Sequence, residues 1–124
     1  MTDYERLVDR YVAMWNEGDA GRRRQAIVEL WAPDGLPAHQ RGEWRGHQAM
    51  EERVTGSWEK SVRDGGNVFV SAGNVEGYRN VLRFNWHMKR AASGATAAKG
   101  FELLTLAEDG RIAADYQFID PMPT

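Results

Sequence analysis

The spacing of apolar residues changes once along this chain, and that change restricts the fold more than any other feature. Over residues 3–63 apolar side chains recur every three or four positions, as on amphipathic helices. From Asn67 onward they alternate with polar ones, as on strands with one buried face. Helices are therefore expected at residues 3–16, from a cap at Asp19 to about Trp31, and at 47–63, and strands at 67–72, 78–89, 97–107 and 111–119.

Three helices followed by hairpins predict an α+β fold, a cone-shaped barrel in which a curved antiparallel sheet wraps around the N-terminal helices. The 124 residues suit a single domain over 1–124, and no linker or repeat interrupts them. Residues 36–46 are expected to form a small strand or strand pair that carries His39 and Trp44. A cone of this kind usually binds small ligands at its mouth.

Composition removes several classes of function. The chain has no cysteine, which excludes disulfides and thiol chemistry. A formal net charge of −2 gives no general attraction to nucleic acid or anionic membranes. The three histidines lie on separate elements, so neither a metal nor another cofactor is expected. Without a signal-peptide pattern or a spanning apolar stretch, a cytoplasmic protein is expected.

Two polar side chains stand on otherwise apolar faces. Tyr11 is the one hydrogen-bond donor on the apolar face of the first helix, so its hydroxyl points either into a pocket or at a backbone carbonyl. Glu102 shares a strand face with Leu104. A buried acid there needs a partner, which favours a role for Glu102 in a pocket.

Trp15, Trp58, Phe84, Trp86 and Leu104 are expected to form apolar lining or core. Solvent exposure is expected for the triple arginine at 22–24 and for the side chains of His87 and Asp115.

The chain resembles the nuclear transport factor 2-like superfamily, in its SnoaL-like and ketosteroid-isomerase-like branch. The resemblance spans almost the whole chain and rests on a helix started by Gly46 and on RYVAMWNEGDA at 10–20, LWAPDG at 30–35, VLRFNWHM at 81–88, GFELLTL at 100–106 and DGRIAADYQFID at 109–120. It implies one apolar cavity and a homodimer formed through the outer face of the sheet. Its members include isomerases, cyclases, dehydratases, hydrolases and non-catalytic binding modules, so the fold alone does not decide the function.

The family pattern can be transferred residue by residue. The tyrosine that donates to the substrate oxyanion in steroid-isomerase-like members falls on Tyr11, and the protonated acid beside it falls on Glu102. The proton-shuttling carboxylate falls on His39, so here the base would be an imidazole. The catalytic acid of cyclase-like members falls on Gln117, which transfers protons poorly and is expected to contact the ligand instead.

Two functions remain open from the sequence. The first is a cofactor-free isomerase, dehydratase or hydrolase that acts on a small apolar or carbonyl-bearing molecule, with His39 as the base and Tyr11 and Glu102 as donors. Glu102 would be a neutral donor, as described for ketosteroid isomerase, or would ionise and raise the pKa of His39. The second function is a ligand-binding or dimerisation module without chemistry, which the departures at His39 and Gln117 favour.

Overall fold

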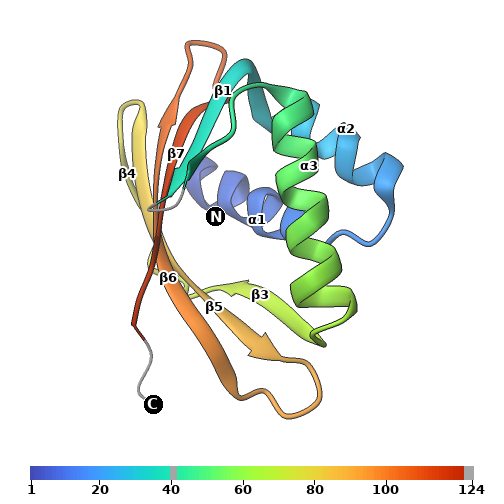
Figure 1. The fold of residues 1–124 in the computed structure, drawn as a ribbon. Coiled ribbons are helices and arrows are strands. Elements are labelled where there is room, and N and C mark those ends of the chain that lie inside the picture. The colour runs from blue at the N-terminus through green and yellow to red at the C-terminus, as the bar shows by residue number, and fades with distance from the viewer. Residues whose placement is uncertain (40–41, 122–124) are drawn as a thin grey trace.

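Three helices pack against one face of a curved, open sheet in the computed structural model (Figure 1). The model describes residues 1–39 and 42–121, with the backbone alone at His39. The helices are α1 (Asp3–Asn16), α2 (Ala20–Leu30) and α3 (His47–Ser57), the last continued by a π-helical segment η1 (Trp58–Arg63). The strands are β1 (Trp31–His39), β2 (Gly42–Glu43), β3 (Asn67–Ser71), β4 (Glu76–Tyr78), β5 (Val81–Arg90), β6 (Thr96–Leu106) and β7 (Ile112–Ile119).

The first two helices begin where the sequence supplies capping side chains. The hydroxyl of Thr2 accepts from the backbone of Glu5, whose carboxylate accepts from the Thr2 backbone in return. Asp19 caps α2 by accepting a hydrogen bond from the Arg22 backbone N–H at 2.8 Å. The predicted starts of both helices and the cap at Asp19 are confirmed.

The sheet has the order β2-β1-β7-β6-β5-β3. The short strand β4 pairs with the first residues of β5, which β3 does not reach. Most neighbouring strands are antiparallel, as predicted, but β1 and β7 run parallel. That pair joins the segment between the second and third helices to the last strand of the chain. The α+β class and the curved sheet around three helices are therefore confirmed, with a mixed and unclosed sheet.

The core lies between the helices and the concave face of the sheet. Its centre consists of side chains from α1, α2, α3, β1, β5, β6 and β7: Val8, Tyr11, Met14, Trp15, Ile27, Leu30, Trp31, Met50, Val54, Leu82, Phe84, Leu104 and Ile112. In the described part of the chain no helix is long and apolar enough to cross a membrane.

The prediction of a wholly solvated arginine triplet was wrong for Arg23. Its side chain is only 3% exposed, and its guanidinium lies 5.1 Å from the Trp58 ring centre. It donates to the carbonyl of Glu17 at 2.7 Å and to the Thr55 hydroxyl at 3.2 Å. Arg23 therefore ties α2 to the loop after α1 and to α3, whereas Arg22 and Arg24 stay exposed.

Candidate functional site

Tyr11 of α1 and Asp115 of β7 meet inside the molecule. Their exposed fractions are 2% and 0%, and the Tyr11 hydroxyl donates a hydrogen bond to Asp115 Oδ2. Gln117, two residues further along the same face of β7, donates from Nε2 to the Tyr11 oxygen at 3.1 Å and to Asp115 Oδ2 at 3.4 Å. The Tyr11 hydroxyl was predicted to point either into a pocket or at a backbone carbonyl; its acceptor is instead a buried carboxyl group.

Glu102 lies on the neighbouring strand β6 and is 2% exposed. The indole Nε1 of Trp86 on β5 donates to Glu102 Oε1 at 3.0 Å. Trp86 pairs with Gly100 across the two strands, and a Cβ at Gly100 would lie 2.4 Å from the indole ring. The absence of a side chain at Gly100 thus lets the indole lie flat over the strand and reach Glu102 two residues away.

The carboxyl groups of Glu102 and Asp115 are hydrogen-bonded to each other, and each influences the pKa of the other. Burial raises the pKa of Glu102 well above its usual range, and the negative charge of Asp115 and a hydrogen bond with Asp115 raise it further. Burial also raises the pKa of Asp115, to about 6, while hydrogen bonds from Glu102 and Tyr11 keep it from rising more. Glu102, whose pKa is raised both by burial and by the charge of Asp115, is therefore the member of the pair that holds a proton more readily.

The remaining oxygens of the pair are consistent with that assignment. Glu102 Oε2 and Asp115 Oδ1 are buried and, within residues 1–39 and 42–121, have no other hydrogen-bond partner. Two ionised carboxylates cannot bond to each other, but a proton on Glu102 supplies the missing donor. Burial, and after it the neighbouring carboxyl groups of Asp115 and Glu102, raise the pKa of Tyr11 well above its usual value, so its phenol remains a donor.

Arg53 of α3 is a positively charged residue that interacts electrostatically with Asp115. Burial lowers the pKa of Arg53, and electrostatic interaction with the acidic groups of Tyr11, Glu102 and Asp115 partly offsets this. Its positive charge in turn holds down the pKa of Asp115. Sequence reasoning missed Arg53, although its position three residues after Met50 and next to Val54 places it beside the buried stripe of α3.

The prediction that Asp115 faces outward was wrong, and a β-bulge explains why. Leu106 pairs with Ile112, whereas Thr105 pairs with Ala114, so Ala113 is an extra residue in β7. Strict alternation from the buried Ile112 would direct Asp115 to solvent; the extra residue turns Asp115 and Gln117 inward. Gln117 was expected to contact a ligand. Because residues two apart on a strand share a face, that expectation could have placed Asp115 on the inner face as well.

The other predicted site residues divide into two groups. Trp15 and Phe84 lie against Tyr11, with ring centres 6.2 and 5.6 Å from the phenol, and Leu104 is fully buried beside them in the core. Trp58 lies away from this set, because it stacks with Arg23 and lies against Gly18 in the loop between α1 and α2.

His39 lies at the end of β1, where its backbone pairs with that of Gln117. Its imidazole lies outside the described residues. In the described part of the chain, His, Asp and Glu side chains form no group of three that could hold a metal ion.

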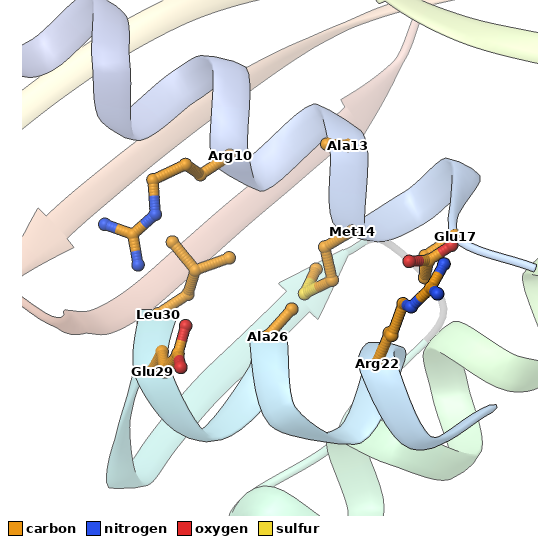
Figure 2. A pocket seen from close by; sticks show the side chains of 8 residues that line it. All are labelled: Arg10, Ala13, Met14, Glu17, Arg22, Ala26, Glu29 and Leu30. Carbon is orange, nitrogen blue, oxygen red and sulfur yellow. The ribbon is translucent and has the colours of Figure 1, made fainter. Parts of the chain in front are cut away.

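A separate groove of about 210 Å³ lies between α1 and α2 (Figure 2). Met14, Ala26 and Leu30 form its floor, Arg10 and Glu29 lie at one end, and Arg22 and Glu17 at the other. The described residues that line it include no member of the buried acid set. The groove is therefore a surface feature, distinct from the candidate site.

Fold and site together define an α+β cone protein with acidic groups buried between its sheet and helices. The sequence matches the SnoaL-like domain family over residues 8–115, and the chain belongs to this family. No curated protein matches the sequence.

Solved structures agree with this assignment. A candidate isomerase of the SnoaL-like family from Agrobacterium tumefaciens shares 28% identity with a TM-score of 0.87, over 98% of this chain and 100% of that one. A SnoaL-like protein from Burkholderia thailandensis shares 11% identity with a TM-score of 0.73, over 98% and 99% of the two chains. A candidate polyketide cyclase from Sinorhizobium meliloti shares 14% identity with a TM-score of 0.66, over 90% and 93%. The last two are similar in fold alone.

Proposed function

We propose that this protein is an isomerase-type enzyme that moves a proton on a small carbonyl compound without a cofactor. The observation that supports this most is the buried pair of Glu102 and Asp115, in which Glu102 holds a proton more readily than Asp115 does. Such a division supplies an acid and a base within one site. The relative from Agrobacterium tumefaciens that is described as a candidate isomerase supports the same class of reaction.

Each residue has a role in the proposed reaction. The Asp115 carboxylate removes a proton from a carbon next to the substrate carbonyl, and the electron pair of that C–H bond forms an enolate. The O–H groups of Glu102 and Tyr11 donate to the enolate oxygen. Asp115 then returns the proton to a different carbon, which shifts the double bond and restores the enzyme. His39, whose backbone pairs with Gln117, is a second proposed proton acceptor.

Ligand entry is part of the proposal. Tyr11, Glu102 and Asp115 are at most 2% exposed, so a substrate reaches them only if a neighbouring side chain moves. Trp86 is the proposed candidate, because its indole is half-buried and is bound to Glu102 by one hydrogen bond. A substrate oxygen that replaces the indole N–H would meet the Glu102 carboxyl directly.

A set of cyclic β,γ-unsaturated ketones of increasing size tests the reaction. Ultraviolet absorbance follows their conversion to conjugated isomers, and mass spectrometry in deuterated buffer follows exchange at the α carbon. We expect Asp115→Asn and Glu102→Gln each to reduce the rate by about two to four orders of magnitude. The matched controls are Asp9→Asn and Glu52→Gln, whose side chains are exposed.

A binding module without chemistry is the alternative, and the closed packing of the acid set favours it. Wild-type protein that binds these ketones but neither isomerises them nor exchanges their α protons would establish the alternative. Turnover that is unchanged in both site variants would refute the proposed roles. Conversion by wild type and the control variants alone would support them.

The homodimer implied by the family is also a proposal. The convex face of the sheet carries exposed aromatic side chains near the end of β7: Tyr116 and Phe118 are 41% and 46% exposed. Phe118 lies beside Phe101 of β6, with ring centres 6.0 Å apart. A contiguous aromatic surface of this kind is typical of a face that a second copy covers.

A further inference from the structure

The guanidinium of Arg53 lies between two tryptophans from different parts of the chain. Its central carbon is 5.4 Å from the ring centre of Trp15 on α1 and 4.9 Å from that of Trp44, in the segment between β2 and α3. Stacking on two indoles fixes the plane of the group without using its N–H donors. Arg53 is therefore held in orientation while its hydrogen-bonding edge remains available.

That edge lacks a protein acceptor where one would be expected. Arg53 Nε is buried and has no hydrogen-bond partner among the described residues. Other arginines of the described chain form ion pairs with carboxylates, namely Arg6, Arg24, Arg63, Arg83 and Arg111. A buried charged donor without an acceptor is costly, so an acceptor supplied by a ligand would offset that cost.

The position of Arg53 relative to the acid set indicates where the ligand would lie. The ring centre of Trp15 lies 5.4 Å from the guanidinium carbon of Arg53 and 6.2 Å from the ring centre of Tyr11, so one indole adjoins both groups. Arg53 Nε has no hydrogen-bond partner among the described residues, so the acids do not satisfy it. A ligand between Arg53 and the acids could therefore contact both.

The chemistry of the donors selects the anion. A carboxylate accepts two parallel hydrogen bonds from Nε and one terminal nitrogen of a single guanidinium. A phosphate dianion would need more positive charge than one arginine beside two acidic residues provides.

We propose that Arg53 determines substrate specificity by binding the carboxylate of a small acid, whose ketone or hydroxyl oxygen reaches Glu102 and Asp115. This proposal rests on the proposed function for the second half of that statement only. The substrate class becomes a small keto or hydroxy acid. Trp15 and Trp44 hold the fork of Arg53 in the orientation that a planar carboxylate requires.

Calorimetric titration with matched probes tests the proposal. The probes are benzoate, phenylacetate and 2-naphthoate, each compared with its own primary amide, which has nearly the same shape but no charge. For at least one pair we expect wild type to bind the acid about ten- to a hundredfold more tightly than the amide, as for a charge-assisted hydrogen bond. Arg53→Gln should abolish this preference while the affinity for the amide is kept.

Two further variants distinguish the role of Arg53 from a packing effect. Arg53→Lys keeps the positive charge but loses the planar pair of N–H donors, so its preference for the acid over the amide should fall between those of wild type and Arg53→Gln. If Arg53→Gln does not fold, the reduced preference of Arg53→Lys tests the proposal in its place. The control Arg90→Gln removes an exposed arginine and should keep the full preference.

Equal affinity of wild type for acids and amides, no binding of any of the acids, or a preference that survives in Arg53→Gln and Arg53→Lys would each overturn the proposal. A preference that depends on Arg53 without turnover of any ketone would support carboxylate binding while the proposed reaction failed. Turnover without an acid preference would do the reverse.

Discussion

Replacing Asp115 with asparagine should stabilise the protein at neutral pH. Asparagine has nearly the same shape, and its carbonyl can accept the hydrogen bond from the Tyr11 hydroxyl, while its amide takes the place of the oxygen that faces Glu102. The substitution removes a negative charge from a position that is 0% exposed. Removing a buried charge is favourable when its desolvation costs more than the attraction of nearby positive charge and the lost hydrogen bond from Glu102 contribute.

The raised pKa of Asp115 gives the size and the direction of the effect. The rise from 3.8 to about 6 means that the folded state binds the proton more tightly than the unfolded state does. Stability therefore falls as the pH rises from about 4 to about 6 and then stays low, a loss of about 3 kcal/mol in total. Asparagine carries no such loss, so its advantage should be up to about 3 kcal/mol at pH 7 and should vanish at or below about pH 4.

Urea denaturation at a series of pH values measures this advantage. We expect the free energy of unfolding of Asp115→Asn to exceed that of wild type at pH 7, with the two curves converging in acid. The exposed control Asp9→Asn should follow wild type throughout. A variant that is less stable than wild type at neutral pH, or a difference that does not change with pH, would refute the assignment of the charge to Asp115.

The remaining predictions concern Gly100 and the convex face. Gly100→Ala places a Cβ 2.4 Å from both the Trp86 ring and the Phe118 carbonyl, so it should destabilise the protein by about 1–3 kcal/mol and change the tryptophan fluorescence. Its control is Gly56→Ala on α3, where nothing lies within 4 Å of the added methyl and stability should rise by about 0.5–1 kcal/mol. Phe118→Lys should convert a dimer into a monomer in sedimentation equilibrium without loss of fold; wild type that is already monomeric would refute the proposed interface.

Local sequence signals predicted most of the fold because they act over a few residues. The spacing of apolar side chains and the cap at Asp19 located the first two helices, and alternation located the later strands. The π-helical end of the third helix and the short strand β4 were not predicted, because neither carries a distinct local pattern. The parallel pairing of β1 with β7 depends on contacts between distant segments, which no local period encodes.

The candidate site was predicted only in part for the same reason. Tyr11 and Glu102 were identified because each is a polar residue on an otherwise apolar face. Asp115 was assigned to the wrong face because a single extra residue, Ala113, reverses the alternation of β7. Arg53 was missed because its orientation depends on ring contacts with Trp15 and Trp44, which lie on other segments of the chain and are brought to it by the fold.

The negative charge of Asp115 lowers the stability of the fold but is required by the proposed reaction. The charge that should cost about 3 kcal/mol at neutral pH is the charge that the proposed proton transfer requires. A substitution that stabilises the fold but abolishes turnover would be typical of an active-site residue. The two measurements on Asp115→Asn therefore support each other without sharing an assay.

The protonation of Glu102 at neutral pH is the central claim, and infrared difference spectroscopy tests it most directly. We predict that wild-type protein at pH 7 shows the C=O stretching band of a neutral carboxylic acid. Asp115→Asn should retain this band and Glu102→Gln should lose it. The absence of the band from wild type, or its loss in Asp115→Asn with retention in Glu102→Gln, would contradict the account.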